Sequence, residues 1–135
     1  MKDQKSDLKT YVALTPRAAI ASDTTTAGAI IDRLGFDAVT FSIISGVLTD
    51  GAYAVLIEEG DDSGLSDAAA VADSDLIGTE ALAGFAATDD GVAKTIGYIG
   101  VKRYVRLSIV STSTSSGGFI AATAILGCPH NAPTS

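Results

Sequence analysis

Few side chains in this sequence are of the types that do chemistry, and they do not make up a complete site. Cys128 and His130 are the single cysteine and single histidine of the 135 residues, in the segment GCPHNAPTS. A thiol beside an imidazole can act as a nucleophile with its base, but catalysis also needs a group that orients the base and a pocket. A structural zinc ion needs four ligands. We therefore expect no enzyme activity, no metal and no cofactor.

A second candidate for chemistry is the acidic segment EEGDDSGLSD, residues 58–67. Oxygen ligands of the kind that Ca²⁺ prefers are offered there by Asp61, Asp62, Ser63 and Asp67. Their spacing does not match the EF-hand loop, and Asp-Asp-Ser-Gly is ordinary turn chemistry. We favour a turn and leave a cation at this loop as an alternative.

Motifs for other reactions are missing from the sequence. The glycines of TDDGVAKTIGYIG do not form a phosphate-binding pattern. The serine-rich STSTSSGG has no nucleophile-elbow motif. Paired carboxylates for glycoside hydrolysis need a cleft, which usually has aromatic walls, and this chain has no tryptophan and 6% aromatic residues.

The densest group of cations lies in VKRYVR, residues 101–106. If the chain is extended there, Lys102, Tyr104 and Arg106 share one face and Arg103 lies on the other. Tyrosine and arginine are frequent in the energetic centres of protein interfaces. The alternative is a solvated ladder in which these cations pair with the two glutamates of the acidic segment on a neighbouring strand. Both interpretations stay open at this stage.

The elements that would position these residues are predicted to be strands. In FDAVTFSIIS the apolar side chains of Val39, Phe41 and Ile43 alternate with smaller residues, which is the period of a strand. The four clearest strands are predicted at residues 36–45, 52–59, 103–111 and 118–127. Weaker strands are predicted at residues 9–14, 17–21, 27–32 and 95–100. Turn signals separate them at the spacing of an all-β sandwich or barrel.

The connections carry further expectations. Asp50-Gly51 ends the loop GVLTDG and is a strong hairpin signal, and STSTSSGG is predicted as a second hairpin loop. TTTAGAIIDRLG is predicted as a strand, with a threonine-capped helix ending at Gly35 as the alternative, since three threonines disfavour a helix. Residues 60–91 are rich in Ala, Asp and Gly and are expected to hold one or two short helical turns, one starting at Ser66.

Length and composition limit the domain organisation and the partners. A chain of 135 residues suits one domain, expected over residues 10–127, with a flexible arm at residues 1–9 and a tail at residues 128–135. The net charge of −7 disfavours nucleic acid as a partner. No segment reaches the length of about 18 apolar residues typical of a membrane span, so we expect no membrane contact. The mean hydropathy of +0.34 is then best explained by a protein–protein interface.

The charged residues are unevenly distributed along the chain. No Lys or Arg lies between Arg33 and Lys94, while that interval holds most of the acidic residues. Such asymmetry either steers the protein toward a partner or keeps an apolar chain in solution.

The charged beginning, MKDQKSDLKTYVALTP, has no apolar core of a secretory signal. A single cysteine fits synthesis in a reducing cytoplasm.

The later part of the chain resembles a segment of small structural proteins that tailed phages and prophages encode near the major capsid gene. The order of motifs is D-L-x-G-T-E, then a D-D-G turn, then G-Y-x-G, then K-R-Y-V-R-L. The matching residues are Asp75-Leu76, Gly78-Thr79-Glu80, Asp89-Asp90-Gly91, Gly97-Tyr98, Gly100 and Lys102 to Leu107. Residues 22–46 are similar as well, so the resemblance covers roughly residues 22–126.

This resemblance implies a capsid decoration, or cement, protein with a jelly-roll-like antiparallel β-sandwich. Such a protein has no enzymatic activity; it is made in the cytoplasm of the bacterial host and binds major capsid protein subunits on the outside of the virion. Some of these proteins act as dimers, and we expect a homo-oligomer, with the homodimer favoured, for this chain. The candidate interface residues are Lys102, Arg103, Tyr104, Arg106, Lys5, Lys9 and Tyr11. The alternatives are a head–tail joining or tail component, and a glycan-binding jelly-roll module.

Overall fold

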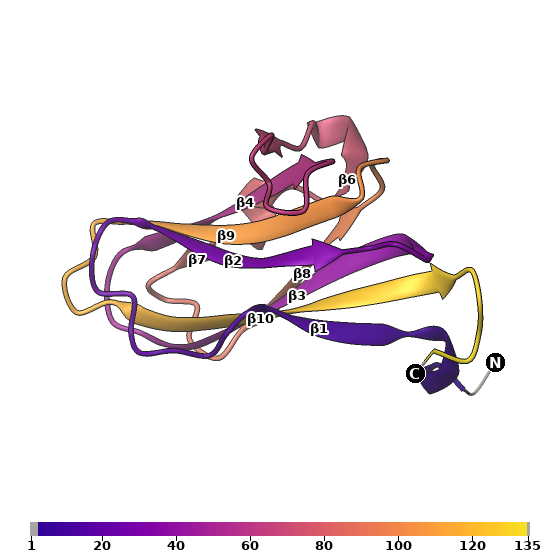
Figure 1. Ribbon diagram of the computed structural model, residues 1–135. Coiled ribbons are helices and arrows are strands. Elements are labelled where there is room, and N and C mark those ends of the chain that lie inside the picture. Colours follow the sequence, from indigo (N-terminus) through magenta and orange to yellow (C-terminus); the bar gives the residue numbers. More distant parts are fainter. Residues whose placement is uncertain (1–2, 135) are drawn as a thin grey trace.

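A computed structural model, which describes residues 3–134, contains two antiparallel β-sheets packed face to face (Figure 1). We name them after their central strands. The β3 sheet has the order β1 (Lys9–Leu14), β10 (Gly118–Pro129), β3 (Phe36–Leu48), β8 (Ala93–Tyr98) and β6 (Leu76–Ile77). The β9 sheet has the order β2 (Thr25–Asp32), β9 (Tyr104–Thr112), β4 (Ala52–Gly60) and β5 (Ala69–Ala70), with β7 (Phe85–Ala86) also paired to β4.

The strand order is that of a jelly roll, which confirms the predicted fold class. Successive long strands change sheet: β1 and β2, β3 and β4, and β9 and β10 each lie in different layers. Two interleaved four-stranded Greek keys produce this arrangement. The chain therefore crosses the sandwich at each end, and neighbours within a sheet come from distant parts of the sequence (Figure 1).

Both predicted hairpins are wrong. The loop after β3 turns at Gly51, which has a φ of 87°, but it leads β4 into the other sheet, where β4 pairs with β9. The loop STSTSSGG likewise joins β9 to β10 across the sandwich. An Asp-Gly pair fixes a tight reversal of the chain, whereas the pairing partner depends on which face each strand must bury.

The core confirms the predicted alternation within the long strands. Phe41 in β3 and Leu107 in β9 are both 0% exposed, and they face each other's sheet across the interior. The inward residues of the four clearest strands are buried as expected: Val39, Phe41, Ile43, Tyr53, Val55, Ile57, Val105, Leu107, Ile109, Ile120, Ala122, Ala124 and Leu126. The hydrophobic contact between the layers is the main stabilising term for such a sandwich.

Three of the four weaker predicted strands are confirmed, and the prediction for residues 17–21 is wrong. Residues 17–21 form no strand; they contribute only an isolated bridge between Ile20 and Gly118. Residues 27–32 lie in β2, so the helical alternative for TTTAGAIIDRLG is excluded. The pairing of β2 with β9 shifts register between Ala27 and Ile30.

The segment between β4 and β8 contains the helical turns that the sequence predicted, although at other positions. The 3₁₀ turn η2 spans Asp73–Asp75 and the helix α1 spans Glu80–Ala83. The expected start at Ser66 is wrong, because Ala69–Ala70 form strand β5 on the edge of β4. The actual cap is Thr79, whose Oγ1 accepts a hydrogen bond of 3.1 Å from Leu82 N. No helix within residues 3–134 has the length and apolar character needed to cross a bilayer.

The two chain ends meet at one end of the sandwich (Figure 1). Before β1, a 3₁₀ turn η1 spans Lys5–Asp7. After β10, Thr134 donates from its backbone N to Ser6 O at 2.8 Å and from its hydroxyl to Leu8 O at 2.6 Å. Of the predicted arm at residues 1–9 and tail at residues 128–135, Met1, Lys2 and Ser135 lie outside the described residues.

Candidate interaction surfaces

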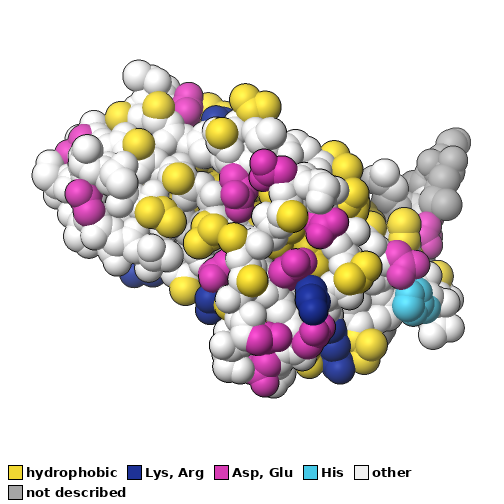
Figure 2. All heavy atoms as spheres, turned by 90° about the horizontal axis from the view of Figure 1, so that it is seen from above, with side chains coloured by type: hydrophobic (Ala, Val, Ile, Leu, Met, Phe, Trp, Pro, Cys, Tyr) yellow, Lys and Arg dark blue, Asp and Glu magenta, His cyan; other side chains and the backbone are white. Residues whose placement is uncertain are grey.

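The cations of VKRYVR are held by carboxylates of the same chain. Lys102 Nζ lies 2.7 Å from Asp61 Oδ2. The guanidinium of Arg103 donates two hydrogen bonds, of 2.9 and 2.8 Å, to the two carboxylate oxygens of Asp32. This contact lowers the pKa of Asp32 and raises that of Arg103. In Figure 2 acidic side chains and lysine or arginine side chains accordingly lie next to one another.

One pair is the cross-strand ladder that the sequence offered as an alternative. Arg106 in β9 and Glu58 in β4 are directly opposite in the register, and Arg106 Nη2 lies 2.9 Å from Glu58 Oε1. Tyr104 is half-buried beside them, and its ring centre lies 5.0 Å from the Arg103 guanidinium. Lys102 precedes β9, so it does not share the strand face as predicted. The structure thus brings these residues together, but with most of their charge already paired.

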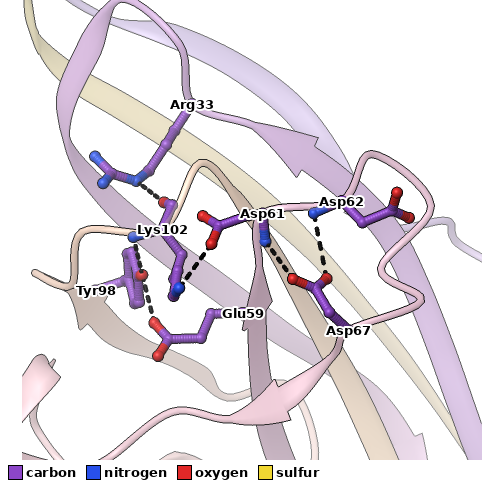
Figure 3. Close-up of polar contacts among 7 residues, drawn as sticks. All are labelled: Arg33, Glu59, Asp61, Asp62, Asp67, Tyr98 and Lys102. Carbon is purple, nitrogen blue, oxygen red and sulfur yellow. Dashed lines mark hydrogen bonds and ion pairs between the residues drawn. The ribbon is translucent and has the colours of Figure 1, made fainter.

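A buried tyrosine connects the two sheets next to this cluster (Figure 3). The hydroxyl of Tyr98 in β8 donates to Glu59 Oε2 at 2.5 Å and accepts from Lys102 N at 3.1 Å. Tyr98 is 1% exposed, and its burial together with the bond to Glu59 raises its pKa well above the ordinary value. Arg33 stacks on the ring at 5.6 Å and donates to the carbonyl oxygens of Lys102 and Gly100. This network fixes the loop between β8 and β9.

Replacing Tyr98 by phenylalanine is expected to destabilise the fold by about 1–3 kcal/mol, because the Glu59 carboxylate and the Lys102 N–H lose their shared partner. The measurement is the free energy of unfolding from urea titration. Tyr104→Phe is the matched control, since the Tyr104 hydroxyl has no hydrogen-bond partner within residues 3–134. Equal losses in the two variants would contradict the structural role of the Tyr98 hydroxyl.

In the acidic loop, residues 58–67, two carboxylates accept hydrogen bonds from backbone N–H groups of the loop itself. The Asp67 carboxylate accepts from Asp61 N at 2.9 Å and from Asp62 N at 3.2 Å (Figure 3). The Asp62 carboxylate accepts from Gly64 N at 2.9 Å and from Ser66 N at 3.2 Å. These bonds lower the pKa of both carboxyls. The four hydrogen bonds are the turn chemistry that we favoured for this loop. Within residues 3–134 no three His, Cys, Asp or Glu side chains are grouped to hold a metal ion.

A carboxylate that we did not single out as a functional group organises the loop between β9 and β10. Asp50 accepts from the backbone N of Ser115, Ser116 and Gly117, at 3.2, 3.0 and 2.9 Å, and from the Ser115 hydroxyl at 2.6 Å. The hydroxyl of Ser115, followed by these amides, holds the pKa of Asp50 well below its ordinary value. The sequence showed only a turn signal at Asp50, because its acceptor role depends on a loop 65 residues away.

The remaining predicted interface residues lie elsewhere, near the chain ends. Lys9 and Tyr11 in β1 are opposite the buried residues Leu126 and Ala124 of β10, so they point toward the β9 sheet at the open edge of the sandwich. The Lys9 ammonium lies 5.5 Å from the centre of the Tyr11 ring. Lys5 and Lys9 line a shallow hollow with Thr134, and neither lysine makes an ion pair within the described part of the chain.

Cys128 and His130 make no hydrogen bond to each other within residues 3–134. Cys128 is exposed, near the end of β10. His130 Nε2 lies 2.9 Å from Asp37 Oδ1, and both side chains are largely exposed. Its backbone N donates to Gly35 O at 2.8 Å, so this part of the tail is attached to the loop before β3.

The outer face of the β3 sheet carries no charged side chain along its register rows. We call it the uncharged face. One row across the five strands is Ile77, Gly97, Thr40, Ile125 and Thr10. The next row is Thr95, Ser42, Thr123 and Val12, and the third is Ala93, Ile44 and Ala121. Phe119 and Gly46 follow at the end nearest Arg17.

Large apolar side chains stand exposed on this face. The exposed fractions are 60% for Ile77, 55% for Ile44, 54% for Val12 and 47% for Phe119. Between them lie Thr95, Ser42 and Thr123, whose hydroxyls can both donate and accept. Sequence reasoning missed this surface, because the period of two marks the outward residues of one strand but not the strands that lie beside it.

Neither a family model nor a curated protein matches this chain. Solved structures do share its fold. The PBSX exported protein XepA is 20% identical with a TM-score of 0.55, over 88% of this chain and 37% of that chain. This chain thus spans little more than a third of the XepA chain.

Two further solved structures are similar at a lower level. The SPBc2 prophage-derived protein YomS is 13% identical with a TM-score of 0.42, over 89% of this chain and 92% of that one. The structure of infectious bursal disease virus Gx strain is 14% identical with a TM-score of 0.49, over 93% of this chain and 34% of that one. The fold likeness to XepA concerns the jelly roll alone.

Proposed function

We propose that this chain is a non-enzymatic structural protein of a phage virion, which decorates the outside of the capsid and stabilises it as a homodimer. The observation that carries the proposal is the jelly roll with a broad uncharged face, because such a surface suits contact between proteins rather than the binding of a small charged substrate. The motif resemblance over residues 22–126 supports a phage particle as the place of this protein, and the likeness to XepA supports the architecture alone.

The proposed contact with the major capsid protein is the edge that carries Lys5, Lys9 and Tyr11. Its two lysines have no ion-pair partner within residues 3–134, unlike Lys102, Arg103 and Arg106. Free cations at the rim of an interface raise the rate of association with an acidic partner. Many identical sites on a head would make modest contacts effective.

The test uses heads assembled from the major capsid protein encoded in the same genome, without and with this protein. The protein is expected to sediment with the heads and to raise the temperature at which they lose integrity. Lys5→Gln/Lys9→Gln is expected to weaken binding on the order of 3- to 10-fold, from the loss of two exposed charge contacts. Thr49→Glu/Thr112→Glu is the control, since it lowers the net charge equally at the opposite end of the sandwich.

Two outcomes would contradict this function. Heads that are equally stable without the protein would exclude a cementing role. Electron microscopy that places the protein at a single vertex, rather than over the whole head, would favour the alternative of a head–tail joining component.

A further inference from the structure

We propose that the uncharged face of the β3 sheet is the surface through which two copies of this chain associate. The inference rests on the proposed function in one respect: it names the surface of the dimer proposed there. Its three rows across the strands contain no Asp, Glu, Lys, Arg or His. The rows begin and end at Ile77 and Thr10, at Thr95 and Val12, and at Ala93 and Ala121. Protein surfaces usually carry about a quarter to a third charged residues, so this face is unusual for one that stays in water.

The size of the face is that of the centre of a dimer interface. Strands lie about 4.8 Å apart and rise about 3.3 Å per residue, so the five strands and the six steps from Thr40 to Gly46 along β3 cover roughly 20 Å by 20 Å. That is on the order of 400 Å², about half of the roughly 800 Å² per partner of a standard interface, and the side chains around the face supply the rest. Two such sheets can pack face to face about 10 Å apart, like the layers within a sandwich.

A second copy suits this face better than a charged partner does. The chain has a net charge of −7, so most of its surface repels another copy. Along the three rows of the uncharged face two copies meet without burying a like charge, and the one cation beside it, Arg17, lines the hollow with Ile44 and Phe119 at the end of the face. A partner with charged groups at the contact would instead leave those groups desolvated and unpaired.

The distribution of side chains also agrees with a two-fold axis. In a two-fold dimer the same patch is used by both copies, so its centre meets itself. Ser42 lies on β3, the middle strand of the sheet, between Thr95 and Thr123. Hydroxyls both donate and accept, and so they can pair with identical hydroxyls. Around them Ile44, Val12 and Ile77 supply exposed apolar area for the contact.

The test is sedimentation equilibrium of the purified full chain at micromolar concentrations. The wild type is expected to have twice the mass of the chain. Thr95→Lys and Ser42→Lys are expected to raise the dissociation constant on the order of 100-fold, because each copy would bury an unpaired ammonium. Thr112→Lys is the matched control: it is an exposed strand threonine of the β9 sheet, and the dimer is expected to persist.

The outcomes separate this inference from the proposed function. A monomeric wild type, or dimers that survive both lysine substitutions in folded protein, would overturn the inference. The exposed position of Thr95 keeps that variant folded, and circular dichroism checks this. Binding to heads is measured independently: a dimer that does not bind heads contradicts decoration, whereas a monomer that binds and stabilises heads contradicts the self-interface and the homodimer but not decoration.

Discussion

Replacing Gly28 by alanine is expected to destabilise the protein by more than about 3 kcal/mol, at the upper end of what overpacking does. Gly28 lies in the irregular part of β2, where the register with β9 shifts. A Cβ atom there would lie far inside van der Waals contact of the carbonyl oxygens of Ala13 and Leu107. These are backbone atoms of β1 and β9, which belong to different sheets, so neither can move without disturbing a layer. The measurement is the free energy of unfolding from urea titration.

Gly127→Ala is the matched control, because Gly127 is also a strand glycine. Its Cβ would meet side-chain atoms, of which the nearest is Leu8 Cδ2 at 3.3 Å. The end of a leucine side chain can shift, so we expect a change below about 1 kcal/mol. A Gly28→Ala protein as stable as the wild type would show that β2 does not approach β1 and β9 as closely as described.

Replacing Phe41 by alanine is expected to destabilise the protein by about 3–5 kcal/mol, the usual range for a buried phenylalanine. Phe41 is 0% exposed and stands in β3 opposite Ala124 and Ile96. Its removal leaves a cavity between the sheets that small neighbours such as Ala124 cannot fill. Thermal and urea unfolding measure the loss.

Thr40→Ala tests the other face of the same strand. Thr40 precedes Phe41 and points to the uncharged face, so its substitution is expected to change stability by less than about 0.5 kcal/mol in the monomer. A large loss for Thr40 with a small loss for Phe41 would mean that β3 is inverted, since one step along a strand exchanges its faces. The uncharged face would then be the core, and the self-interface would not exist.

Features of the fold that depend on neighbouring residues could be predicted from the sequence, whereas those that depend on distant segments could not. The alternation of Val39, Phe41 and Ile43 predicted the buried face of β3 from neighbouring residues alone, and it was confirmed. The same local signals at Asp50-Gly51 predicted a hairpin and were wrong, because pairing is decided by the competition of all strands for two layers. Turn chemistry is local, whereas the choice of sheet is not.

The candidate sites show the same division. The sequence placed Lys102, Arg103 and Arg106 together correctly, because they lie within five consecutive residues. It could not establish that Asp32 holds Arg103, a contact between residues 71 apart. Three of the cations predicted for an interface therefore hold internal ion pairs, whereas Lys5 and Lys9 make none within residues 3–134. Contact of any of them with a partner stays a prediction.

The sequence by itself determined that this chain is an all-β sandwich, which faces of its long strands are buried, and that its few reactive side chains form no recognised catalytic motif. These properties follow from residue type and a period of two, which each strand carries within itself. Only the tertiary structure decided the jelly-roll order, the partner of each cation and the existence of the uncharged face. That face is assembled from five strands of separate segments, and its lack of charge is a property of their register, which long-range packing alone can set.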